Sequence, residues 1–141
     1  MSTLDDVAAA ALYRLTREPY EHVGLLYENG GAIERTPTRS QRSQGRASGR
    51  FEVPSGSLRA LFHNHPPSST EGAEFSARDM SNAQRLGVPS YITSGDRVRR
   101  FDPATGEAKD VLHQIPIDEW RRQLMIELLK RDPDDPRGVR R

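Results

Sequence analysis

The chain has 141 residues, a length typical of one domain, and its 21 Lys and Arg against 20 Asp and Glu leave a net charge of +1. This balance gives no overall attraction to nucleic acid, and a hydrophobic content of 34% predicts that part of the chain lies outside the core. The sequence has no cysteine, which excludes disulfides, thiolate zinc clusters and a cysteine nucleophile. Any metal ion must therefore be bound by His, Asp or Glu.

Neither a membrane anchor nor a signal peptide is expected from the sequence. No apolar run approaches the roughly 20 residues that cross a bilayer. Asp5 and Asp6 stand where a signal peptide would carry positive charge. We therefore expect a soluble, cytoplasmic protein with no membrane partner.

The first predicted elements are a helix and a β-hairpin. Apolar residues recur at helical spacing over residues 3–17, and Thr3 can cap the first turn. An apolar run over 22–28, an Asn-Gly-Gly turn at 29–31 and a second short run over 32–35 then predict the hairpin.

Residues 36–50 are almost without apolar side chains and predict a mobile basic loop. Residues 35–50 contain no acidic residue and five arginines: Arg35, Arg39, Arg42, Arg46 and Arg50. Such a loop is either a solvated segment or a contact surface for an acidic partner.

The middle of the chain predicts alternating strands and one helix. The apolar patterns and turn residues predict strands at 51–53, 58–63 or 58–65, 90–93 and 98–101, a helix at 76–86 that Gly87 ends, and a turn at 94–96. A third helix is predicted at 118–130, followed by a disordered charged tail at 131–141. We find no internal repeat. The expected architecture is one α/β domain over residues 1–130, with a mostly antiparallel sheet flanked by helices.

The residues with the clearest chemistry are two histidines at the end of a predicted strand. Side chains two apart on a strand point to the same side, so His63 and His65 can direct their nitrogens at one ion. Asp79 lies in the first turn of the next predicted helix, where the chain turns back across the end of that strand. Three such ligands leave one tetrahedral position open for water, as in catalytic zinc sites.

Two separated motifs resemble the JAMM motif of the MPN metalloprotease family. One is His63-Asn64-His65-Pro66 followed by Ser76-Ala77-Arg78-Asp79, and the other is Pro19-Tyr20-Glu21-His22-Val23-Gly24-Leu25-Leu26. The resemblance covers most of the chain, about residues 4–96. It implies an MPN domain with a cytidine-deaminase-like fold and one Zn²⁺ per chain, bound by His63, His65 and Asp79.

The resemblance also implies a reaction and two catalytic residues. Glu21 would be the general base that activates water, and Ser76 would donate its hydroxyl to the oxyanion. The expected activity is that of a zinc metallopeptidase or isopeptidase that hydrolyses an amide bond. The implied substrate is a protein or peptide, such as the C-terminal tail of a ubiquitin-like protein. A nucleic-acid substrate is not favoured by the net charge.

Each of these residues also has a simpler interpretation. His63 and His65 could be ordinary hydrogen-bonded strand histidines, and Ser76 with Asp79 is close to a helix capping box. Other glutamates compete for the role of base: Glu18, Glu28 and Glu52. His22, Asn64 and His113 are interpreted as structural or surface residues.

Two other functions stay open from the sequence. One is a non-catalytic MPN-like interaction module. The other is a RadC-like or toxin-associated JAMM domain with a different substrate, since His-Asn-His-Pro also occurs in RadC-like proteins. The stretch 67–75 is longer than is usual in the JAMM family, which makes Glu71 and Glu74 candidates for substrate contacts.

Overall fold

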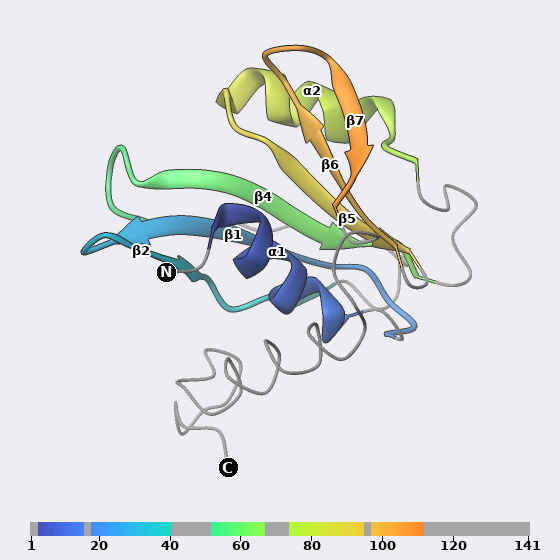
Figure 1. Cartoon of the computed structure of the whole chain (residues 1–141). Coiled ribbons are helices and arrows are strands. Elements are labelled where there is room, and N and C mark those ends of the chain that lie inside the picture. Colours follow the sequence, from blue (N-terminus) through green and yellow to red (C-terminus); the bar gives the residue numbers. More distant parts are fainter. Residues whose placement is uncertain (1–2, 16–17, 41–51, 67–73, 95–96, 112–141) are drawn as a thin grey trace.

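A mostly antiparallel β-sheet with one helix on each face forms the described part of the computed structural model, residues 3–15, 18–40, 52–66, 74–94 and 97–111 (Figure 1). The helices are α1 (Leu4–Tyr13) and α2 (Ala77–Leu86), and the strands are β1 (His22–Asn29), β2 (Ala32–Arg35), β3 (Arg39–Ser40), β4 (Leu58–Asn64), β5 (Ser90–Ser94), β6 (Arg97–Asp102) and β7 (Glu107–Asp110). Within the described residues these seven strands form one sheet in the order β2-β1-β4-β5-β6-β7, with β3 also paired to β1. The predicted α/β class is confirmed.

One pair of neighbouring strands is parallel, and this pair places the start of α2. β4 and β5 run in the same direction, with His63 beside Ile92, whereas the other strand pairs are antiparallel. A parallel pair needs a crossover connection, and α2 lies in that connection. The helix must run back against the strand direction, so its first turn lies at the end of the sheet where β4 stops.

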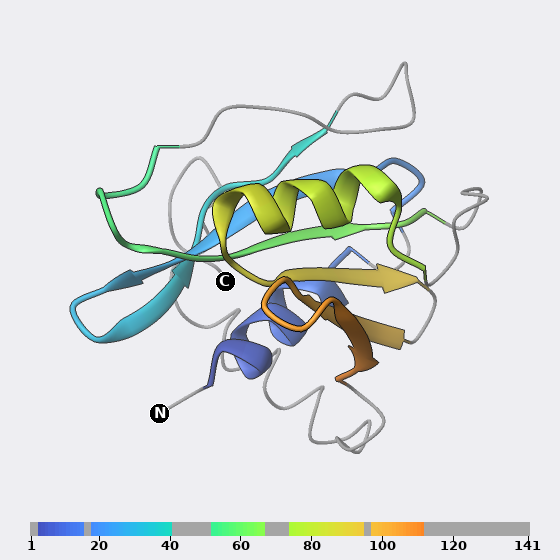
Figure 2. The same cartoon turned by 90° about the horizontal axis from the view of Figure 1, so that it is seen from above.

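The two helices cover opposite faces of the sheet (Figure 2). Side chains of α1, including Ala8 and Leu12, pack in one cluster with Leu26, Ala60 and Phe62. Because side chains alternate along a strand, Ala60 and Phe62 on the α1 face put the intervening odd residues of β4 on the α2 face. His63 therefore faces α2.

Gly24 allows β1 and β4 to pair around a large core side chain. Gly24 lies directly opposite Phe62 in the antiparallel register, and Phe62 is fully buried. A Cβ atom on residue 24 would come within 2.5 Å of the Phe62 Cζ atom. Any side chain here would force the Phe62 ring from its place, because a closely packed core has little room to adjust.

A partly buried polar cluster joins α1 to the sheet. The Tyr91 hydroxyl donates to the Asp5 carboxylate, and the Arg100 guanidinium lies 2.7 Å from the same Asp5 oxygen. Burial and the neighbouring Asp5 carboxylate both raise the pKa of Tyr91, which keeps the phenol protonated as a donor. The cluster fixes the first turn of α1 against β5 and β6.

Three predictions about individual elements were wrong in detail, and one strand was missed. α1 ends at Tyr13 rather than at 17, because the chain tightens into a turn in which the Leu15 N–H donates to the Leu12 carbonyl at 2.8 Å. Residues 52–53 do not form the predicted strand, since Pro54 and the turn at 55–56 follow at once. The predicted basic loop contains the short strand β3, which pairs with β1. The edge strand β7 was not predicted, because its side chains are mostly exposed and carry no apolar pattern.

Several predictions lie outside the described residues. These are the remainder of the basic loop at 41–50, the helix at 118–130 and the tail at 131–141. No helix in the described part of the chain has the length and apolar character needed to cross a membrane.

Candidate metal centre

His63 and His65 are held by two different strand pairings at the end of β4. His63 is the penultimate residue of β4 and lies opposite Val23 of β1. The His65 N–H, just beyond the strand, donates to the Thr93 carbonyl at 2.7 Å. This pairing keeps the chain extended for one more step, so the two imidazole rings emerge on the same face. Their Nε2 atoms lie 3.1 Å apart, and both side chains are buried.

Asp79 reaches the two histidines from the first turn of α2. Its Oδ1 lies 3.2 Å from the Nε2 of His63, and its Oδ2 lies 3.5 Å from the Nε2 of His65. A capping box fixes the carboxylate: the Ser76 N–H donates to Asp79 Oδ2 at 2.9 Å, and the Asp79 N–H donates to Ser76 Oγ at 3.0 Å. The predicted capping box and the predicted contact with both histidines are therefore present together.

The environment of Asp79 favours its charged form. Burial by itself would raise the pKa of this carboxyl, but the hydrogen bonds with His63 and His65, the electrostatic interaction with His63 and the hydrogen bond from the Ser76 N–H hold it well below its usual value of 3.8. Asp79 is therefore an anion at neutral pH. A partly buried carboxylate between two imidazole nitrogens is a suitable set of donors for a cation.

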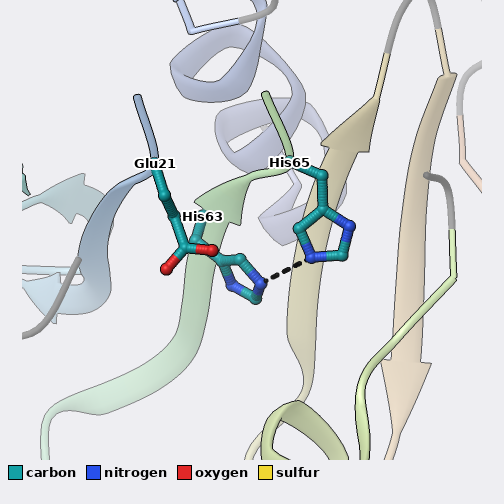
Figure 3. A group of neighbouring side chains, drawn as sticks. All are labelled: Glu21, His63 and His65. Atoms are coloured by element: carbon teal, nitrogen blue, oxygen red, sulfur yellow. Dashed lines mark hydrogen bonds between the residues drawn. The ribbon is translucent and has the colours of Figure 1, made fainter. Parts of the chain in front are cut away.

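Glu21 lies beside the two histidines, directly before β1. A carboxylate oxygen of Glu21 and one ring nitrogen each from His63 and His65 all lie within 4.8 Å of one another. Figure 3 shows the Glu21 side chain directed from the start of β1 toward His63. This group could hold a metal ion, although the donor set does not by itself select zinc.

The competing glutamates take other places. Glu18 Oε2 lies 3.7 Å from His22 Nε2, and Glu28 forms an ion pair with Arg59 near the far end of β1. Glu74 is exposed and lies 3.3 Å from an Arg99 nitrogen. Glu52 is exposed on the segment before β4. Among the described glutamates, Glu21 is the one grouped with His63 and His65; Glu71 and His113 lie outside the described residues.

Ser76 caps α2 and places its hydroxyl group at the end of the sheet where Asp79 meets the two histidines. Its Oγ accepts the Asp79 N–H, and its side chain is partly exposed. A serine hydroxyl that accepts one hydrogen bond still has its own proton to donate. The capping role and the predicted role as an oxyanion donor are thus chemically compatible.

Asn64 has a closer relation to the site than the sequence indicated. Strand alternation predicted that it points away from the histidines and has a structural role. Its side-chain amide nevertheless contacts the backbone on both sides of Glu21: Oδ1 accepts the His22 N–H at 2.6 Å, and Nδ2 donates to the Tyr20 carbonyl at 3.1 Å. The only sequence signal was a polar residue at a buried position between the two histidines.

Comparison with known proteins adds no family to these observations. The sequence matches no protein-family model, and no curated protein matches it. The resemblance to the JAMM family therefore still depends on the two motifs and their spacing.

Proposed function

We propose that this protein is a zinc-dependent hydrolase of the JAMM type that cleaves an amide bond, with His63, His65 and Asp79 as the metal ligands. The observation that carries the proposal is the set of distances among the three donor groups. Ligand atoms at the usual zinc bond lengths in a tetrahedral site stand about 3.3 Å from one another. The two Nε2 atoms are 3.1 Å apart, and each lies close to a different Asp79 oxygen, His63 at 3.2 Å from Oδ1 and His65 at 3.5 Å from Oδ2, so each pair of groups is near this spacing.

The arrangement also supports a catalytic rather than a closed structural site. Three protein donors leave one tetrahedral position for water, and when bound, zinc would lower the pKa of that water toward about 7 and polarise a carbonyl. The Glu21 carboxylate lies next to the histidines and would accept the proton of the water. It would then return this proton to the leaving nitrogen.

Ser76 would complete the reaction site as a hydrogen-bond donor to the substrate. Its hydroxyl would donate to the carbonyl oxygen of the substrate as negative charge develops there. The capping box holds its Oγ within 3.0 Å of the Asp79 nitrogen and so beside a metal ligand. The family resemblance adds the substrate class, an amide at the flexible C-terminal tail of a ubiquitin-like protein.

Protein purified without added metal is expected to contain one zinc per chain and to cleave such an amide. The substrate is a fusion that joins a ubiquitin-like domain through its C-terminal tail to a reporter, and elemental analysis gives the metal content. A chelator should remove both zinc and activity, and added zinc should restore both. Zinc-loaded protein that binds the tail but cleaves nothing would favour an interaction module. A metal-free protein would mean that hydrogen bonds alone hold the three residues.

Ser76→Ala is expected to retain zinc and to lose about a hundredfold or more in kcat, as for one lost oxyanion donor. Because Ser76 also caps α2, the matched control is Thr3→Ala, which removes the same kind of cap from α1, where Thr3 forms a capping box with Asp6. Steady-state cleavage and zinc content should be measured for both variants. If both lose activity equally, Ser76 acts only as a helix cap.

A further inference from the structure

The side chain of Asn64 continues the pairing between β1 and β4 beyond the last residue pair of their backbones. The pairing ends with Val23 opposite His63. The carbonyl before a strand residue and the N–H after it point to the same edge of the strand. For Glu21 these groups are the Tyr20 carbonyl and the His22 N–H, and both meet the amide of Asn64, at 3.1 and 2.6 Å. The Asn64 side chain thus takes the place of a main-chain partner from β4 at the next step of the pairing.

Beyond the pair Val23 and His63, the contacts from this end of β4 to the residues on either side of Glu21 come from the side chain of Asn64. The next N–H, that of His65, points to the other edge of β4 and donates to the Thr93 carbonyl of β5 at 2.7 Å. Asn64 is 1% exposed, so a buried amide with two backbone partners replaces solvent at this point. Both of its polar atoms are satisfied, which makes the contact specific as well as stable.

We propose that Asn64 is a positioning residue that holds Glu21 extended, so that its carboxylate stays directed at His63 and His65. An extended residue two before Val23 points to the same face as Val23, and Val23 lies opposite His63. Without the amide, the Tyr20 carbonyl and the His22 N–H lose these two contacts to β4. The inference rests on the proposed function for its catalytic consequence, but the placement of the backbone can be tested separately.

The kinetic test is a double-mutant cycle between Asn64→Ala and Glu21→Gln. A misplaced base costs rate, so Asn64→Ala should lower kcat by about tenfold to a hundredfold with little change in KM and with full zinc content. If Asn64 acts through Glu21, the same substitution should lower the residual rate of Glu21→Gln by no more than about twofold. A loss of the same size in both backgrounds would overturn the proposal.

The matched control is Thr36→Val. Thr36 is buried, and its Oγ1 accepts the Leu25 N–H at 3.0 Å, so it also bonds the backbone of β1 through its side chain. This bond lies four residues beyond Glu21. Thr36→Val removes one buried bond to β1 and should leave kcat within about twofold of the wild type once folded protein is compared.

Amide hydrogen exchange by NMR gives a readout that needs no turnover. The His22 N–H should exchange at least about tenfold faster in Asn64→Ala than in the wild type, while Thr36→Val should accelerate Leu25 and not His22. Asn64→Ser, which offers one polar atom in place of two, replaces Asn64→Ala if the latter does not fold.

The outcomes separate this inference from the proposed function. Unchanged exchange at His22, or acceleration of both amides in both variants, would overturn the positioning role whatever the activity. Selective exchange at His22 in a protein that cleaves no amide would support Asn64 as the residue that places Glu21 and overturn the hydrolase.

Discussion

Glu21→Gln is expected to lower turnover by about a hundredfold to ten-thousandfold, the usual cost of losing a general base, while the protein keeps its zinc. The amide has nearly the size of the carboxylate and keeps most hydrogen bonds, but it cannot accept the proton. The three proposed metal ligands, at the end of β4 and in α2, are unchanged, so metal content should not fall. Steady-state cleavage and elemental analysis on the same preparations measure both quantities.

Glu18→Gln is the matched control, since Glu18 lies three residues earlier and 3.7 Å from His22 rather than in the group with His63 and His65. Its turnover should equal that of the wild type. Wild-type turnover in Glu21→Gln at full zinc occupancy would remove Glu21 from the mechanism.

Asp79→Ala is expected to release the metal and abolish cleavage. Loss of a residue that only orients a ligand typically weakens metal binding by about 10- to 100-fold, and loss of a ligand should weaken it more. His63→Ala should have the same effect. The Nε2 of His63 is 3.2 Å from an Asp79 oxygen, so both residues are proposed to bind the same ion. The measurement is zinc affinity by competition with a chelator of known strength.

The control for Asp79→Ala separates metal binding from helix capping. Asp79 is the third helical residue of a capping box, and Asp6 has the same place in the box at the start of α1. Asp6→Ala should lower the free energy of unfolding by about 1 kcal/mol without loss of zinc. If Asp79→Ala retains zinc and changes stability only as Asp6→Ala does, its carboxylate is a cap and not a ligand.

The sequence predicted those parts of the fold in which one face of an element is buried. β1, β4, β5 and β6 carry apolar residues on their covered faces, and both helix starts have capping residues. β3 and β7 were missed because strands at the edges of the sheet bury little and pair mainly through their backbones. No side-chain pattern can report such pairing.

The candidate site shows the same division. The spacing of His63 and His65 could be interpreted directly, since alternation on a strand is a local property. The approach of Asp79 to both rings was expected from its place in the first turn of the next helix, but the parallel pairing of β4 with β5 that accompanies it was not, because local sequence does not specify which strands pair. The role of Asn64 was beyond prediction, because its two partners lie 42 and 44 positions earlier in the chain and are backbone atoms common to every residue.

The position of Asp79 is set by α2 and not by the connection that precedes the helix. α2 contacts β5 and β6, and its capping box begins at Ser76, so neither feature depends on how many residues link Pro66 to Glu74. Insertions and deletions in such a connection cost little closure entropy. Variants in which this link is lengthened or shortened are therefore expected to keep Asp79 beside His63 and His65.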